Sequence, residues 1–228
     1  MGKTKNKLIP HGRVLPYQFQ NSERICMCKI YISHFKQSNE NKYQTQHQAG
    51  LSLLRHALKD YANLDLMEDE LEKNIEKGNY GKPFLRSYPH IHYNISNCQD
   101  IVVCAVSKQP VGVDIEKVRD FNKKIIRKVL TSEEQLFLQK ITGNDCLQQE
   151  WFFRFWTLKE SFIKHCGQGL SMPLTDVSFS FDSTQAPYGI TCSQEGVFFY
   201  QEKIENQYIL SLCTTIPKII PHLEVRWY

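Results

Sequence analysis

The chain has 228 residues, 41% of them hydrophobic and 12% aromatic, which suits one large domain or two small ones with buried cores. Its 28 basic and 24 acidic residues leave a net charge of +4, too small an excess to indicate a nucleic-acid-binding domain. No run approaches the ~20 apolar residues of a membrane-spanning helix, and the basic, polar start does not resemble a signal peptide. We therefore expect a cytoplasmic protein that binds neither nucleic acid nor membrane, with its eight cysteines reduced.

The first half of the chain mixes helical and strand patterns. An apolar run over 26–32 predicts a strand, and leucines at helical spacing predict a helix over 44–61. A second helix is expected over 67–77, ending at Gly78. Beyond a Gly-Lys-Pro turn, three strands are predicted: 91–95, 101–106 and 111–115. We expect the last two of these strands to form a hairpin around Pro110.

The second half begins with a helix expected over 122–130. Thr131 and Glu134 then have the spacing of a capping box, which starts another helix. The longest predicted helix, 145–165, carries an aromatic stripe, and Gly167 stands at its C-cap. Alternating patterns predict the closing strands: 177–181, 197–204, 209–213 and 223–227.

Helices and strands in mixed order, joined by short connections, predict an α+β fold. Because each half combines helices with strands, we expect two α+β lobes of similar topology, residues 1–109 and residues 110–228, meeting near Pro110. The active site is expected in the cleft between the lobes, which is a favoured place for a large ligand.

Two carboxylates stand out on the predicted strand that follows Pro110. Asp114 and Glu116 are two residues apart, so both side chains lie on one face of the strand, with apolar neighbours on the other. A cation between the two acids would explain this arrangement, and Mg²⁺ accepts such ligands while leaving room for phosphate oxygens. The alternative is a simply solvated face, since acids with this spacing are common in proteins.

A third acid, Glu160, lies in the middle of the longest predicted helix, four residues before Lys164 and on the same helix face. As an ordinary surface ion pair, the two residues would contribute roughly a few tenths of a kcal/mol. The surrounding helix is unusually aromatic and is therefore expected to be buried on most sides, so its charges need partners. Glu160 and Lys164 are thus candidates for the same site as the two strand acids.

Together these motifs resemble a known family. The segment Gly-Val-Asp-Ile-Glu at 112–116, followed by Trp-x-x-Lys-Glu-Ser-x-x-Lys-x-x-Gly-x-Gly-Leu at 156–170, resembles the paired signature of the 4′-phosphopantetheinyl transferase superfamily. Upstream, the segments 81–83 and 92–96 resemble the Gly-Lys-Pro and Asn-x-Ser segments of the long, monomeric, surfactin-synthetase-activating (Sfp-like) type. The resemblance implies the pseudo-dimeric α+β fold of this superfamily, with the metal site carried by the C-terminal lobe.

The resemblance also implies a reaction, in which the 4′-phosphopantetheine group of coenzyme A passes to a serine of an apo acyl or peptidyl carrier protein. The products would be holo carrier protein and adenosine 3′,5′-bisphosphate. Asp114, Glu116 and Glu160 resemble the ligands of Mg²⁺, with Mn²⁺ as the alternative ion, and Glu160 also resembles the general base for the serine. Lys164 resembles the catalytic lysine that neutralises the pyrophosphate and assists the leaving group. A monomer is expected.

Further positions match those that contact coenzyme A in the family: Lys82, Ser96, Lys164 and, less closely, Lys159. Asn97 stands where the family usually has a histidine that touches phosphate; an amide can donate a hydrogen bond there but carries no charge. No arginine lies near Gln46, where one is expected for the 3′-phosphate of coenzyme A. Glu134 matches an additional acid near the metal in some members.

Two other functions explain part of the pattern. A different Mg²⁺-dependent phosphoryl or nucleotidyl enzyme would account for the three acids and Lys164, but not for the Gly-Lys-Pro, Asn-x-Ser and Gly-x-Gly-Leu segments. A non-catalytic binding module descended from the transferase would not need the acids and the lysine intact. Pyrophosphatase or kinase activity without a carrier protein would indicate the first alternative, and coenzyme A binding without transfer would indicate the second.

Overall fold

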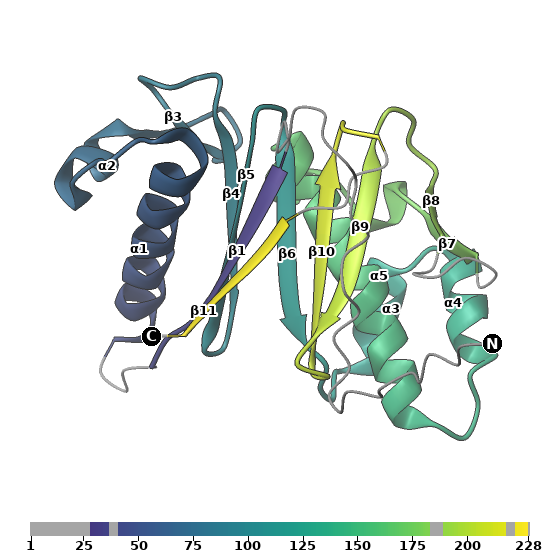
Figure 1. Ribbon diagram of the computed structural model, residues 1–228. Helices are drawn as coiled ribbons and strands as arrows, with labels where there is room; N and C mark the ends of the chain where they lie inside the picture. The colour runs from purple at the N-terminus through teal and green to yellow at the C-terminus, as the bar shows by residue number, and fades with distance from the viewer. Residues whose placement is uncertain (1–27, 37–40, 183–188, 218–221, 228) are drawn as a thin grey trace, which may run out of the picture.

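The computed structural model describes residues 28–36, 41–182, 189–217 and 222–227 (Figure 1). It confirms the α+β fold. The strands of its two main sheets are β1 (Cys28–His34), β4 (His92–Cys98), β5 (Ile101–Ser107), β6 (Val111–Lys117), β9 (Phe198–Ile204), β10 (Tyr208–Thr214) and β11 (His222–Trp227). The first sheet has the strand order β11-β1-β5-β4 and the second has the order β6-β10-β9. Helix α1 (Lys42–Ala62) covers the first sheet, and helix α5 (Asp145–Cys166) covers the second.

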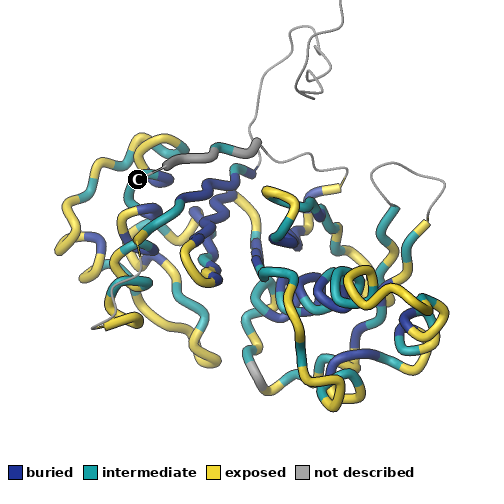
Figure 2. Tube along the Cα trace, turned by 90° about the horizontal axis from the view of Figure 1, so that it is seen from below, coloured by how far each residue is buried: buried dark blue, intermediate teal, exposed yellow. Residues whose placement is uncertain are grey.

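Buried apolar residues fill the three spaces between these four layers. One cluster, which includes Leu54, lies between α1 and the first sheet. Another, which includes Ile30 and Val113, lies between the two sheets. A third, which includes Leu158, lies between α5 and the second sheet. Figure 2 shows buried residues inside both halves of the molecule and exposed residues along the surrounding turns. Each sheet therefore packs on a helix with one face and on the other sheet with its second face.

Helix α1 forms where the leucine spacing predicts a helix. Asn41 caps its first turn, because the side-chain oxygen accepts a hydrogen bond from Gln44 N at 3.2 Å. The helix ends at Asn63, which adopts the left-handed conformation with φ 55° and returns its backbone N–H to the last turn. Leu54 and Leu58 are fully buried on the side that faces the sheet.

The helix expected over 67–77 is shorter in the structure. Helix α2 (Glu68–Asn74) gives way to strand β2 (Ile75–Lys77), which pairs antiparallel with β3 (Pro83–Leu85). Gly78 N donates to Lys82 O at 2.9 Å, closing the turn between the two strands. The Gly-Lys-Pro turn reverses the chain, and the last three residues of the expected helix pair with the strand that follows this turn.

The hairpin expected around Pro110 is wrong. Strand β5 pairs with β1 along one edge and with β4 along the other, so neither edge is free for the next strand. Strand β6 instead pairs with β10, far along the chain, in the second sheet. The hairpin of the first sheet is β4–β5, and its turn is made by Gln99 in the left-handed conformation, with φ 55°.

Strands β4 and β6 meet edge to edge and join the two sheets through side chains instead of backbone hydrogen bonds. Every second residue of β4 accepts a hydrogen bond from a backbone N–H of β6: Asn94 Oδ1 from Val113 at 2.8 Å, Ser96 Oγ from Ile115 at 3.4 Å and Cys98 Sγ from Lys117 at 3.3 Å. An unpaired strand edge needs partners for its N–H groups. We call this junction the β4–β6 seam.

The remaining predictions for the second half mostly agree with the structure. The expected helix over 122–130 is reduced to a 3₁₀ turn (Lys123–Ile125) and the short helix α3 (Ile126–Val129). Helix α4 (Ser132–Gln139) begins with the predicted capping box. Helix α5 ends at Gly167, where φ is 70°.

After α5, two further 3₁₀ turns, Gly169–Ser171 and Leu174–Asp176, lead to strand β7 (Phe179–Asp182). This strand pairs with an unpredicted strand, β8 (Gly189–Cys192). The predicted first strand is β1, but residues 26–27 lie outside the described residues.

The last strand of the chain returns to the first sheet. Strand β11 pairs parallel with β1, and Figure 1 shows its yellow ribbon beside the purple one of β1. The division into residues 1–109 and 110–228 stays a prediction, and on the sheet topology β11 belongs with the strands of the first half. Among the helices that the structure describes, none has the length and apolar character needed to cross a membrane.

Candidate active site

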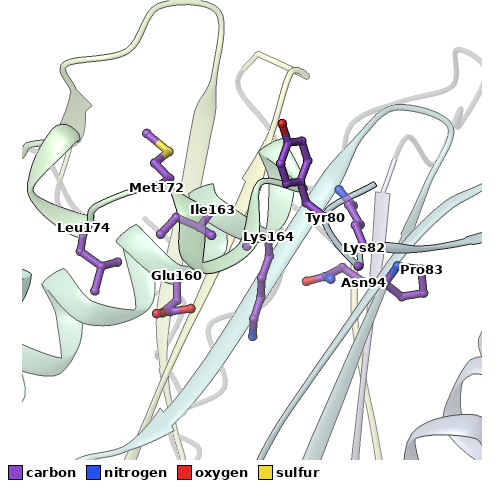
Figure 3. A pocket seen from close by; sticks show the side chains of 12 residues that line it. Tyr80, Lys82, Pro83, Asn94, Glu160, Ile163, Lys164, Met172 and Leu174 are labelled. Carbon is purple, nitrogen blue, oxygen red and sulfur yellow. The ribbon is translucent and has the colours of Figure 1, made fainter. Parts of the chain in front are cut away.

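Two adjoining cavities lie along α5 and the β4–β6 seam. The first, of about 330 Å³, brings together six of the residues predicted from the sequence: Ser96, Asn97, Asp114, Glu116, Glu160 and Lys164. The second, of about 320 Å³, shares Glu160 and Lys164 with the first and is otherwise lined by the turn around Lys82, by Asn94 and by the segment after α5. Figure 3 shows the lining of the second cavity, with Glu160 and Lys164 on α5 to one side and Lys82 and Asn94 to the other.

Glycine at position 112 lets α5 lie directly on β6. A Cβ atom at Gly112 would stand 2.0 Å from Ser161 O and 2.3 Å from His165 N, both of them backbone atoms of α5. Such a distance is far below van der Waals contact, so only glycine fits. Residues 112, 114 and 116 share one face of the strand. The close approach at Gly112 therefore holds the acids of β6 under the helix that carries Glu160 and Lys164.

Asp114 is the most buried acid of the site, with 5% of its surface exposed. Its Oδ1 atom accepts hydrogen bonds from Lys164 Nζ at 2.6 Å and from Ser96 Oγ at 2.8 Å. Lys164 Nζ also lies 2.9 Å from Ser96 Oγ, which closes a triangle between α5, β4 and β6. The other carboxylate oxygen, Asp114 Oδ2, is buried and has no hydrogen-bond partner among the residues that the structure describes. A buried carboxylate oxygen without a partner is costly, and a bound cation is one way to satisfy it.

Glu116 lies at the outer end of the same strand face. Its Oε2 atom accepts hydrogen bonds from the Arg119 guanidinium at 2.7 Å and from the Cys98 thiol at 3.3 Å. Burial and the nearby Glu116 charge raise the pKa of Cys98 to about 11, so the thiol stays protonated and can donate. Cys98 and Arg119 were not predicted as site residues. Cys98 is identified only by the contact of β4 with β6 at the seam, whereas Arg119 could have been noted as a cation three residues after Glu116.

Glu160 faces the other two acids from the helix. Burial is the main reason why the pKa of its carboxyl is raised above the usual range, and the charges of Asp114 and Glu116 raise it further. Lys164 opposes this shift. A carboxylate with a raised pKa is a stronger base than an ordinary one, which suits proton removal from a hydroxyl group.

The three acids offer only oxygen donors, which suit Mg²⁺ or Mn²⁺ better than Zn²⁺. As the side chains lie, no three His, Cys, Asp or Glu residues among the described ones stand close enough to hold a metal ion. Asp114 Oδ2 is buried and without a partner, which fits a cation ligand. Glu116 would have to turn away from Arg119 to join it. The donor set thus fits a hard divalent cation, with the glutamate side chains reoriented.

Lys82 holds the two halves together at the wall of the second cavity. Its Nζ atom donates to His165 O at 2.8 Å, in the last turn of α5, and to Val111 O at 3.1 Å, at the start of β6. Burial lowers the pKa of Lys82 to about 8. The ammonium group therefore has backbone partners already, and contact with a ligand requires one of them to be replaced.

Lys159 and Glu134 lie away from both cavities, unlike the other predicted site residues. The Lys159 side chain is 0% exposed and forms an ion pair with Glu134 Oε2 at 2.8 Å. Its Nζ atom also donates to the backbone oxygens of Leu174 and Val177, at 3.0 and 2.5 Å. Glu134 in turn caps α4 and accepts a hydrogen bond from Phe179 N. The structure therefore brings neither Lys159 nor Glu134 to the acids of β6.

Trp156 is half-buried: it packs against the apolar cluster under α5 and also lines the first cavity beside Glu160. It lies four residues before Glu160 on α5, so the helical spacing could have placed the two on one face. An aromatic wall beside the carboxylates keeps part of the cavity apolar.

Fold and site together define a two-sheet α+β protein whose acidic cavity, with one lysine, lies at the junction of the sheets. Residues 110–213 match the model of the 4′-phosphopantetheinyl transferase superfamily. The chain is 32% identical over 150 residues to a 4′-phosphopantetheinyl transferase of Bacillus subtilis, covering 65% of this chain. It is 34% identical over 145 residues to the 4′-phosphopantetheinyl transferase gsp of Aneurinibacillus migulanus, covering 64% of this chain. Residues 110–213 thus match the 4′-phosphopantetheinyl transferase superfamily, and both relatives carry the name of that enzyme.

The matches span 66% and 60% of the lengths of these two curated relatives. Among solved structures, a holo-(acyl-carrier-protein) synthase from Bacillus anthracis in complex with coenzyme A (3′,5′-ADP) aligns with a TM-score of 0.39 and 18% identity, covering 46% of this chain and 93% of that one.

Proposed function

We propose that this protein transfers the 4′-phosphopantetheine group of coenzyme A to a serine of an apo acyl or peptidyl carrier protein. The observation that carries the proposal is the cluster of Asp114, Glu160 and Lys164 around one cavity at the β4–β6 seam. The names of the similar proteins support the same reaction. The transfer breaks a pyrophosphate bond and releases adenosine 3′,5′-bisphosphate.

The substrate carries dense negative charge, which dictates what the side chains must do. Asp114, Glu116 and Glu160 would hold Mg²⁺ or Mn²⁺, which supplies charge neutralisation for the pyrophosphate when bound. Lys164 is half-buried and would exchange Asp114 for a phosphate oxygen, where its charge favours departure of the leaving group. Glu160, with its raised pKa, accepts the proton of the carrier serine.

The two cavities supply room for both ends of coenzyme A on either side of Lys164. The second cavity has an apolar wall that includes Ile163, Met172 and Leu174, which suits the uncharged part of a ligand. Ser96 and Asn97 line the acidic cavity and can donate hydrogen bonds to phosphate oxygens. Lys82 would reach the ligand from the wall of the second cavity. A monomeric, cytoplasmic protein stays our prediction.

Incubation with coenzyme A, Mg²⁺ and a panel of apo acyl and peptidyl carriers, followed by mass spectrometry, tests this proposal. We expect at least one carrier to gain the mass of one phosphopantetheine group, and the gain to require both coenzyme A and the divalent cation. Coenzyme A cleavage without a modified carrier would indicate a different phosphoryl enzyme. Binding of coenzyme A without cleavage would indicate a binding module, and either result would overturn the proposal.

A further inference from the structure

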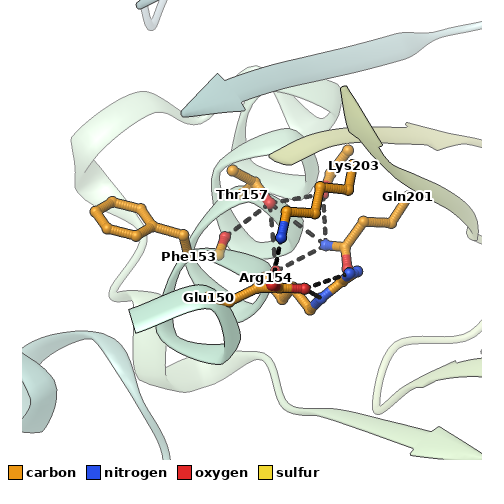
Figure 4. Close-up of polar contacts among 7 residues, drawn as sticks. Glu150, Phe153, Arg154, Thr157, Gln201 and Lys203 are labelled. Atoms are coloured by element: carbon orange, nitrogen blue, oxygen red, sulfur yellow. Dashed lines mark hydrogen bonds and ion pairs between the residues drawn. The ribbon is translucent and has the colours of Figure 1, made fainter. Parts of the chain in front are cut away.

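A chain of buried polar side chains joins α5 to β10 within an otherwise apolar interface (Figure 4). Thr157 on α5 and Ser211 on β10 are both 0% exposed, and their hydroxyl oxygens lie 2.7 Å apart. Gln201 on β9 donates from Nε2 to Ser211 Oγ at 2.9 Å and lies 3.4 Å from Thr157 Oγ1. We call these three residues the Thr157–Ser211–Gln201 triad.

One set of hydrogen-bond directions satisfies every group of the triad. If Thr157 donates its one hydroxyl proton to Phe153 O at 2.9 Å, Ser211 is the donor in the bond between the two hydroxyls. Gln201 uses both protons of its amide, one on Ser211 Oγ and one on Arg154 O at 2.9 Å. Its Oε1 atom accepts from Arg154 at 2.9 Å. All these groups are satisfied in a single orientation, which fixes the side chains.

An ion-pair cluster holds the outer end of the triad. Arg154 pairs with Glu150 at 2.8 Å, and Lys203 of β9 pairs with the other oxygen of Glu150 at 2.6 Å. Figure 4 shows these residues along one side of α5, ending at Thr157. Hydrogen bonds therefore join the helix to the second sheet over two turns, in addition to the apolar packing.

The inner end of the triad lies directly beside the candidate site. Ser211 is the cross-strand partner of Asp114, and directly opposed residues of antiparallel strands point to the same face. Thr157 lies three residues before Glu160 and so shares its helix face. The bond between the two hydroxyls therefore connects Ser211, which lies opposite Asp114, with Thr157, which lies one helical turn before Glu160.

Stability alone does not explain this arrangement. A pair of buried hydroxyls can often be replaced by apolar groups of the same shape at little cost, whereas directional bonds specify one arrangement of the elements. We propose that Thr157, Ser211 and Gln201 are positioning residues that fix the register of α5 on β10 and thereby the separation between Glu160 and Asp114. The proposal rests on the proposed function, because it assumes that these two acids act on one metal ion.

The variants Thr157→Val and Ser211→Ala each remove the hydrogen bond between the two hydroxyls. The variant Thr157→Ser keeps it. Mn²⁺ binding is titrated by electron paramagnetic resonance with coenzyme A present, and transfer kinetics and urea unfolding are measured on the same full-length proteins. Loss of a group that orients a metal ligand typically weakens metal binding by about 10–100-fold. We expect a rise of at least tenfold in the Mn²⁺ dissociation constant, a parallel fall in kcat and little change in the KM for coenzyme A. Thr157→Ser should behave like the natural protein.

Ser161→Ala is the matched control. Ser161 is also 0% exposed on α5, but the bond that its hydroxyl makes among the described residues stays within the helix, to Leu158 O at 2.8 Å. A positioning role predicts that Ser161→Ala binds Mn²⁺ normally even if its urea midpoint falls as far as that of Ser211→Ala. Equal effects on Mn²⁺ binding in both variants, or none in either, would overturn the proposal.

If Thr157→Val fails to fold, Ser211→Ala, the smaller change, decides. If the natural protein binds Mn²⁺ but transfers nothing, the proposed function fails while the binding data still judge the triad; if it binds no Mn²⁺, both fail.

Discussion

Helices α1 and α5 have equivalent places, each on the outer face of its own sheet, but they bury different chemistry. The buried residues of α1 are apolar or glycine. Helix α5 buries Thr157, Lys159 and Ser161 beside its phenylalanines. Because a buried polar group costs free energy unless it is bonded, an interface like that of α5 needs more exact placement than one made of leucines. The comparison indicates that α1 and its sheet serve as a scaffold, while α5 and its sheet carry the residues of the proposed reaction.

The first half still contributes to the site, through the edge of its sheet. Ser96 bonds to Asp114 across the seam, and Asn97 lines the same cavity. The acids and the lysine, however, all come from β6 and α5. The contrast between the halves can be tested by making the same change in each.

The largest effect is expected from Glu160→Gln, which keeps the shape of the side chain and removes its charge. The loss of a general base and metal ligand should lower kcat by roughly 10³-fold. The matched change, Glu72→Gln, affects an exposed glutamate of α2 and should leave transfer unchanged. Near-normal turnover of Glu160→Gln in a mass-spectrometric transfer assay would remove Glu160 from the reaction.

Lys164→Met should lower turnover by ~10²–10³-fold, because a positioned cation stabilises the charge that develops on the leaving phosphate. The control is Lys73→Met, which breaks an exposed ion pair with Asp69 on α2. Such a surface pair contributes less than about 1 kcal/mol to stability. If both variants kept turnover within about threefold of the natural protein, Lys164 would be a bystander.

Alanine in place of glycine should have opposite effects on stability in the two helix–sheet interfaces. At Gly112 the new Cβ would overlap backbone atoms of α5, and we expect a loss of about 3 kcal/mol or more in the free energy of unfolding. At Gly50, inside α1, the nearest atom is Ile95 Cγ2 at 3.5 Å, an ordinary contact. Alanine favours a helix over glycine, so Gly50→Ala should gain about 0.5–1 kcal/mol. Urea unfolding measures both, and a tolerated Gly112→Ala would disprove the close approach of α5 to β6.

The smallest expected effect is on the pH dependence. Glu160 acts as a base only when ionised, and its pKa is raised by burial and by Asp114. The value of kcat/KM should therefore fall as the pH drops through this raised pKa, above the range of an ordinary glutamate. An acid limb at the position typical of a solvated glutamate would show that Glu160 is not the group that titrates.

Local periodicity was enough to predict most of the site. The spacing of two along β6 placed Asp114 and Glu116 on one face, and the spacing of four along α5 placed Glu160 and Lys164 together, as the common cavity confirms. The same rule argues against Lys159. Adjacent helical residues point in different directions, so Lys159 could not share the face of Glu160.

Contacts between distant segments could not be predicted in this way. The sequence favoured a hairpin between β5 and β6 because they are consecutive, but β1 and β4 already occupy both edges of β5. The return of β11 to β1, the bond from Cys98 to Glu116 and the bond between Thr157 and Ser211 all join residues far apart in the chain. Short-range patterns carry no information about such pairs.

A crystal structure of the protein with Mn²⁺ and coenzyme A tests most directly whether the reaction takes place between α5 and β6. We expect the anomalous signal of Mn²⁺ beside Asp114 Oδ2, the buried oxygen that lacks a hydrogen-bond partner, and the pyrophosphate of coenzyme A between that ion and Lys164. Coenzyme A bound outside the two cavities, or a metal ion held without Asp114, would contradict this assignment of the active site.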